Sequence, residues 1–170
     1  MNPVLLLAWL LVLFPSPMLS QHAGQRTSGT PYDAHLGPVR QTYSRLPGAS
    51  PTMDEVRSQL RTARRFRYYF DPAQPYVPQL PEVTEAKRQG DCKAKSLWLI
   101  KKMGDRSSRY VIGKASSESR MWHAWLLWPK EGAWLILDPT TQSDPLNADR
   151  LTGGKWDAKY SYNGSGAYKH

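Results

Sequence analysis

Residues 121–138 read MWHAWLLWPKEGAWLILD, and this stretch decides the fold. Two runs rich in Trp, Leu and Ile flank the segment Pro129-Lys130-Glu131-Gly132, whose composition is typical of a turn. We therefore predict a β-hairpin with a four-residue turn, made of strands over 121–128 and 133–138. In this register Trp128 and Ala133 close the hairpin.

The same register sets His123 opposite Asp138. Opposed residues of an antiparallel pair have a constant index sum, so both side chains project from one face of the sheet. Their Cβ atoms are then expected ~4.5–5.5 Å apart, close enough for the carboxylate to accept a hydrogen bond from the imidazole. A slip of one residue would turn them to opposite faces. The hairpin thus predicts a His123–Asp138 pair that leaves the other ring nitrogen available as a base.

A candidate nucleophile stands upstream, in Gly90-Asp91-Cys92. Asp91 is a good N-cap, and a helical pattern continues to Met103, with Gly104 suited to the residue after the helix. A cysteine in the first turn of a helix lies at the positive end of the helix dipole, which favours the thiolate. Together with His123 and Asp138, Cys92 makes a candidate Cys–His–Asp triad of nucleophile, base and orienting carboxylate.

The remaining pattern is mixed helix and strand. Thr52 and Glu55 have the form of a capping box before an amphipathic helix expected over 53–67. A short helix is expected over 82–88 and a strand over 109–113, while residues 71–81 form an irregular connection. The fold class expected is α+β.

The N-terminal residues suggest export. Val4–Phe14 is an uninterrupted apolar run of 11 residues, shorter than the ~20 that a membrane span needs and typical of a signal peptide. We expect a signal peptide at 1–20, an extended leader at 21–51, the main domain at 52–152, and a C-terminal strand or tail at 153–170. The mature chain would then be periplasmic or secreted, without a membrane span.

Composition narrows the chemistry further. The chain has 170 residues, a formal charge of +9 and one cysteine, which excludes an intramolecular disulfide. Its four histidines have no metal-ligand spacing, so we expect no metal and no cofactor. The positive charge favours contact with anionic surfaces. No nucleic-acid reader motif accompanies it, so no specific nucleic-acid partner is expected.

The order of these motifs resembles the transglutaminase-like superfamily, and within it the bacterial transglutaminase-like cysteine peptidases. The resemblance covers roughly Met53 to Arg150 and rests on residues 90–92, 109–113, 123–126 and 137–140. It implies a papain-like α+β core in which a cysteine-bearing helix packs on an antiparallel sheet. It also implies a thioester acyl-enzyme, an amide substrate, and an upstream residue that helps the Cys92 backbone N–H to hold the oxyanion. Gln79 is our candidate for that role.

The function expected is an exported cysteine hydrolase, a peptidase or amidase acting on a protein or peptide. Two alternatives stay open. One is transglutaminase-type acyl transfer, which uses the same acyl-enzyme but an amine acceptor. The other is a catalytically inactive module of the same fold that binds partners through its basic, tryptophan-rich surface.

Overall fold

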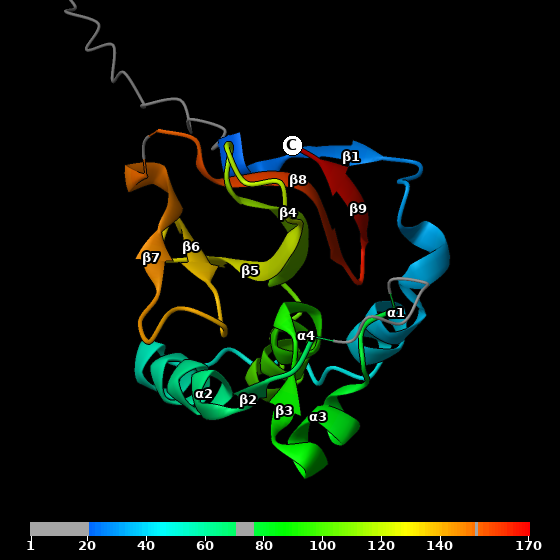
Figure 1. Cartoon of the computed structure of the whole chain (residues 1–170). Coiled ribbons are helices and arrows are strands. Elements are labelled where there is room, and N and C mark those ends of the chain that lie inside the picture. Colours follow the sequence, from blue (N-terminus) through cyan, green and yellow to red (C-terminus); the bar gives the residue numbers. More distant parts are fainter. Residues whose placement is uncertain (1–20, 71–76, 152) are drawn as a thin grey trace, which may run out of the picture.

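A computed structural model of the chain describes residues 21–70, 77–151 and 153–170 (Figure 1). Within these residues the main sheet has seven strands in the order β1-β9-β8-β4-β5-β6-β7, and every neighbouring pair is antiparallel. A separate pair, β2 and β3, is parallel. The strands are β1 (Gln25–Thr27), β2 (Arg67–Tyr68), β3 (Gln89–Gly90), β4 (Arg109–Ser116), β5 (His123–Lys130), β6 (Ala133–Leu137), β7 (Leu146–Asn147), β8 (Lys155–Asn163) and β9 (Gly166–Lys169).

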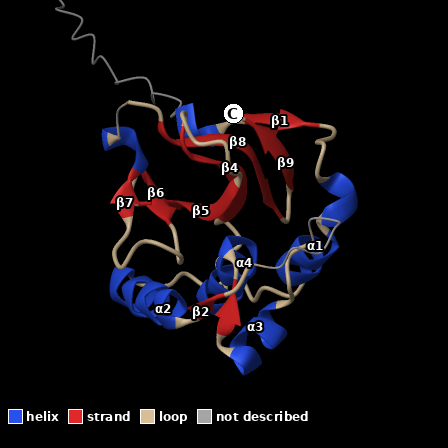
Figure 2. Ribbon diagram, in the orientation of Figure 1, coloured by secondary structure: helices blue, strands red, loops and turns tan. Residues whose placement is uncertain are grey.

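The α-helices gather on one side of the main sheet (Figure 2). Among them α4 is central, because it packs against α2, α3, α1 and β5. The helices are α1 (Gly37–Ser44), α2 (Met53–Arg65), α3 (Pro81–Lys87) and α4 (Cys92–Met103), with short 3₁₀ turns η1 (Gln21–Ala23), η2 (Asp33–His35) and η3 (Ala148–Arg150). A cysteine-bearing helix on an antiparallel sheet is the α+β architecture that the sequence predicts, and the prediction is confirmed.

Both faces of the central strands are buried. On β5 the even-numbered residues, such as Leu126 and Trp128, belong to the core between the sheet and the helices. The odd-numbered Trp125 and Leu127 belong to a second apolar cluster, because side chains alternate along a strand. This double burial explains why the β5 sequence is almost continuously apolar.

Local sequence signals set the ends of the two helices nearest the site. Thr52 and Glu55 make the reciprocal capping box before α2, and Asp91 accepts a hydrogen bond from the Ala94 N–H at the start of α4. Gly104 ends α4 in the left-handed region with φ 65°. The helix expected over 53–67 ends at Arg65 instead, because Phe66 turns to an extended conformation that leads into β2.

The hairpin forms with a different turn and register from those predicted. Lys130 pairs with Ala133, so the turn has two residues, Glu131 and Gly132, with φ of 52° and 77°. Positive φ at both positions is typical of a type I′ turn. Pro129 is a strand residue, paired with Trp134. It is tolerated because the β4–β5 pairing ends at Leu127, so no hydrogen bond to β4 is lost.

The segment expected as an extended leader, 21–51, is part of the fold instead. β1 pairs with β9, and α1 contributes Val39 and Tyr43 to the main core. Pro38, which suggested a loop, occupies the first turn of α1, where a proline costs no intrahelical hydrogen bond.

Residues 153–170 could be a strand or a tail from the sequence, and in the structure they contain the whole of β8 and β9. The core therefore runs across the boundaries expected at 51/52 and 152/153. The signal peptide expected at 1–20 lies outside the described residues. None of the described helices combines the length and apolar character needed to cross a membrane.

Candidate active site

Cys92 is the first residue of α4 and its side chain is buried, with the residue 7 % exposed. Asp91, the N-cap, holds the helix end through its hydrogen bond of 3.0 Å from the Ala94 N–H. The first N–H groups of a helix have no intrahelical partner. The Cys92 sulfur thus lies where backbone donors and the helix dipole favour negative charge.

A buried ion pair accompanies the cysteine. Lys93 Nζ lies 3.0 Å from Asp91 Oδ2, and both side chains are almost fully buried. The lysine charge therefore offsets the negative charge of the N-cap, which would otherwise oppose a thiolate at the next residue, Cys92. The positive lysine is also within the same helical turn as Cys92.

His123 and Asp138 lie in direct contact. His123 Nε2 is 3.0 Å from Asp138 Oδ2, with His123 at the start of β5 and Asp138 directly after β6. The imidazole ring also packs near Trp125 and Trp156, with ring centroids 6.0 Å away in each case. These aromatic neighbours restrict the ring and exclude water from one side of it.

Asp138 is completely buried, and its carboxylate is held by more than the histidine. Oδ1 accepts a hydrogen bond of 2.8 Å from the Thr140 N–H, and Oδ2 accepts one from the Thr141 hydroxyl. The Asp138 N–H in turn donates to Gln142 Oε1 at 3.2 Å. The short turn from 138 to 142 therefore fixes the carboxylate in one orientation.

These contacts raise the pKa of His123 and lower that of Asp138, which favours the charged form of both side chains. Burial by itself lowers the pKa of His123, but hydrogen bonds with Asp138 and Cys92 and their negative charges outweigh it and raise the pKa to about 10. For Asp138, burial raises the pKa, while His123, Thr141 and Thr140 together hold it below its ordinary value. At neutral pH the pair is imidazolium and carboxylate.

The histidine thus interacts with both of the other predicted residues. Nε2 engages Asp138, which leaves Nδ1 as the ring nitrogen for the Cys92 side chain. The side chains of Cys92 at the start of α4, His123 at the start of β5 and Asp138 in the turn after β6 are brought together here. Their arrangement can hold a thiolate beside an imidazolium that a buried carboxylate orients.

The position of Gln79 does not match the role of oxyanion donor suggested for it. Its amide nitrogen donates to Thr84 Oγ1 at 3.0 Å and to the Gln89 carbonyl at 3.4 Å. These two bonds use both amide hydrogens, so the side chain has no further N–H for an oxyanion. In this arrangement it holds the backbone at Gln89, directly before Gly90.

Tyr68 is the residue at this site that sequence reasoning missed. It pairs with Gly90 across β2 and β3, two residues before Cys92. Burial, followed by the negative charges of Cys92, Asp91 and Asp138, raises the pKa of Tyr68 to about 12. Its hydroxyl therefore stays protonated at neutral pH. No local pattern signals this, because the β2–β3 pairing joins residues 22 positions apart.

Lys95 is buried one helical turn into α4 and is 2 % exposed. Its Nζ donates a hydrogen bond of 2.6 Å to the Phe66 carbonyl, at the junction between α2 and β2. Burial lowers the pKa of Lys95, and the charge of Asp138 partly opposes this effect. Lys95 therefore connects the cysteine-bearing helix to the strand that carries Tyr68.

No group of three or more His, Cys, Asp or Glu side chains suited to a metal ion occurs in the described parts of the chain.

The architecture is that of the transglutaminase-like fold. The chain is similar to the solved structure of LapG from Legionella pneumophila, with a TM-score of 0.59, 22 % identity, and coverage of 76 % of this chain and 74 % of LapG. The calcium-bound form of that protein matches with a TM-score of 0.58 at the same identity and coverage. No protein-family model and no curated protein sequence matches the chain.

Proposed function

We propose that the chain is an exported cysteine hydrolase, a peptidase or amidase, with Cys92 as nucleophile, His123 as acid and base, and Asp138 as the orienting carboxylate. The observation that carries the proposal is the contact of 3.0 Å between His123 Nε2 and Asp138 Oδ2, combined with a His123 pKa that Asp138 and Cys92 raise. The likeness to LapG, a transglutaminase-like cysteine protease, supports it.

The reaction would begin with attack of the Cys92 thiolate on an amide carbonyl, which forms a C–S bond and a tetrahedral oxyanion. The backbone N–H of Cys92, in the first turn of α4, is the donor we assign to that oxyanion. The His123 imidazolium then gives its proton to the departing amine as the C–N bond breaks. A thioester remains on Cys92.

Release would reverse these roles. Neutral His123 takes a proton from water, and the resulting hydroxide attacks the thioester, which returns the thiolate and a carboxylic acid. A primary amine in place of water would give acyl transfer instead. Asp138 stays ionised throughout and stabilises the imidazolium.

Export is part of the proposal and is supported by the apolar run at Val4–Phe14. A protein or peptide is the proposed substrate, because cleavage of an amide bond is the reaction that the site suits.

The test is covalent capture. Incubating the protein with a peptide library and digesting it should yield, by mass spectrometry, an acyl adduct on the peptide that contains Cys92. The Cys92→Ala variant should give none, and His123→Ala should lower the yield by about 100-fold or more. Adding a primary amine to the trapped thioester separates hydrolysis from acyl transfer. Equal labelling in His123→Ala would contradict the proposal and favour the inactive binding module.

A further inference from the structure

Exposed apolar side chains are concentrated around the proposed thiol site. Seven large hydrophobic residues are exposed in the described chain, and five of them lie on two short segments, 68–70 and 121–122. One segment follows α2 and includes Tyr68 and Tyr69, each 49 % exposed. The other precedes His123 and consists of Met121, 71 % exposed, and Trp122, 44 % exposed. Such clustering marks a binding surface more often than single scattered residues do.

The first segment is attached directly to the start of α4. Tyr68 pairs with Gly90, and the Tyr69 N–H donates to the Gly90 carbonyl at 3.3 Å. A hollow of about 20 Å³ lies beside this attachment, and its walls are Tyr69, Val77, Gly90 and Ala94 with the polar residues Gln79, Gln89 and Asp91. The exposed ring of Tyr69 is therefore held close to the helix end that carries Cys92.

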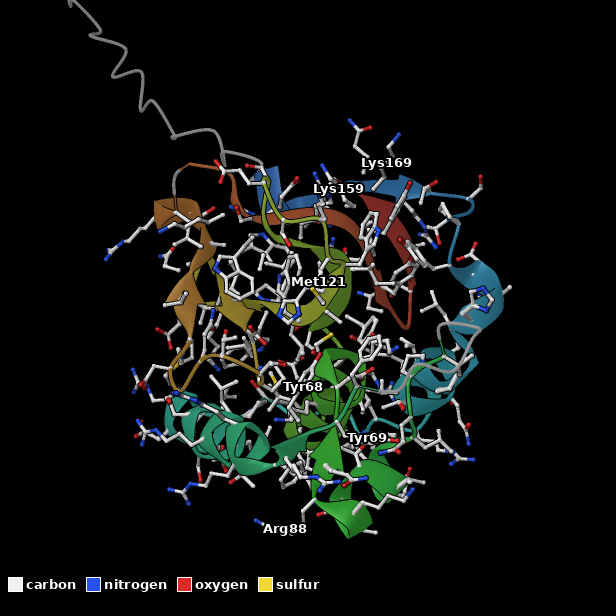
Figure 3. All side chains as sticks on the ribbon, viewed as in Figure 1. Tyr68, Tyr69, Arg88, Met121, Lys159 and Lys169 are labelled. Carbon is white, nitrogen blue, oxygen red and sulfur yellow. The ribbon has the colours of Figure 1, made fainter. Side chains whose placement is uncertain are left out.

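The second segment approaches from the sheet. Trp122 directly precedes His123, and its ring packs edge-on against Tyr32 with a centroid distance of 5.8 Å. This contact holds the indole in place while leaving nearly half of the residue exposed. In Figure 3 Met121 lies beside the sheet and Tyr68 beside the helices, on opposite sides of the region between the two layers.

We propose that Tyr68, Tyr69, Met121 and Trp122 form an apolar rim that selects an extended polypeptide segment with an apolar side chain next to the amide bond attacked by Cys92. The inference rests on the proposed function, and it adds the class of substrate. The four rim side chains carry no charge of their own and are apolar over most of their surface, so the preference expected is for an apolar side chain over a polar one.

Peptidyl chloromethyl ketones test the rim. The thiolate displaces chloride, so a C–S bond forms as the C–Cl bond breaks, and the adduct rate can be followed by mass spectrometry. Probes that differ in one side chain, Leu or Phe against Ser or Glu, are compared at each position. We expect the apolar probes to react about tenfold faster at one or more positions.

Substitutions in the rim test whether these side chains cause the preference for apolar probes. The quantity compared is the rate with the Phe probe divided by the rate of the same variant with iodoacetamide. Tyr69→Ala and Trp122→Ala should each lower this ratio by about tenfold. Val83→Ala is the matched control, because Val83 is the exposed apolar residue on α3, outside the rim. Its ratio should equal that of the unmodified chain.

The two hypotheses fail in different ways. Rapid, His123-dependent reaction with iodoacetamide, together with equal or faster reaction of the Ser and Glu probes, would overturn the rim and leave the proposed function standing. A preference for apolar probes that survives both rim substitutions would also overturn it. Alkylation by iodoacetamide no faster than in the unfolded chain would overturn the proposed function, and the rim with it.

Discussion

His123 Nε2 lies 3.0 Å from Asp138 Oδ2, and the carboxylate in this contact is completely buried. A buried carboxylate needs partners for its charge, and here an imidazolium, a hydroxyl and a backbone N–H supply them. The same charge keeps the imidazole protonated far above its ordinary range. The contact thus couples the stability of the fold to the protonation state that the proposed chemistry requires.

The His123 imidazole is expected to titrate near pH 10, because hydrogen bonds with Asp138 and Cys92 outweigh the effect of burial. An NMR titration of the imidazole signals, assigned with a His123→Gln variant, measures this directly. In Asp138→Asn the midpoint should fall by ~1–3 pH units, since the opposite charge is lost. A midpoint near 6.5 in the unmodified chain would refute the ion pair.

The free energy of unfolding should depend on pH, because folding raises the pKa of His123. The folded pKa of His123, about 10, exceeds the unfolded value of ~6.5. The stabilisation is therefore complete below pH ~6.5 and is lost as pH rises toward 10. The difference in free energy of unfolding between the unmodified chain and His123→Gln should shrink over this window in urea titrations. A difference that stays constant from pH 6 to 10 would contradict this.

Thr141 should act on the site through Asp138. Its hydroxyl donates to Asp138 Oδ2, and removing a hydrogen bond to a charged group costs ~1.5–3 kcal/mol. Thr141→Val should lower the free energy of unfolding by about that amount and raise the pKa of Asp138, whereas Thr141→Ser keeps the hydroxyl and should lose much less. Urea unfolding of the two variants at neutral pH and at pH 4 makes the comparison. Equal losses in both would assign the effect to packing instead.

The His123–Asp138 contact was predictable from sequence even though the hairpin register was not. The predicted and observed registers differ by two residues, because the turn is Glu131-Gly132 rather than the four-residue segment from Pro129. A shift of two keeps every side chain on its face, whereas a shift of one would not. His123 and Asp138 therefore stay on one face at the ends of adjacent strands, and their side chains span the diagonal.

Features that depend on distant pairing were not predictable in this way. Tyr68 reaches the site through a two-residue parallel strand next to Gly90, and neither segment has a strand pattern of its own. The 21–51 region has many turn residues, but its apolar residues Leu36, Val39 and Tyr43 find partners only in the assembled core. Composition reports local preference, and tertiary packing overrides it here.

Gly90 is expected to tolerate no side chain. A Cβ at this position would lie 2.7 Å from Ala94 Cβ and 3.4 Å from Thr84 Cγ2, so Gly90→Ala should force the β3 strand away from α4 at a cost of ~1–3 kcal/mol. Gly37→Ala is the control, since its Cβ would meet nothing within 4 Å. Thermal unfolding and the rate of iodoacetamide labelling should both change in Gly90→Ala only. Equal stability and equal labelling rates in the two variants would show that the close packing at Gly90 does not exclude a side chain.

Lys95 should matter for the position of Tyr68 as well as for stability. Its Nζ donates to the Phe66 carbonyl at 2.6 Å, and Lys95→Met fills the same space but leaves that carbonyl without its donor. Leaving a buried acceptor unpaired costs ~1–3 kcal/mol, so the free energy of unfolding should fall by about that much. Because β2 begins at the next residue, Arg67, hydrogen exchange should also quicken at the Tyr69 N–H, which donates to Gly90. Lys95→Arg keeps a donor and should protect that amide better than Met does. Loss of stability without faster exchange at Tyr69 would mean that Lys95 supports the core alone and does not position β2.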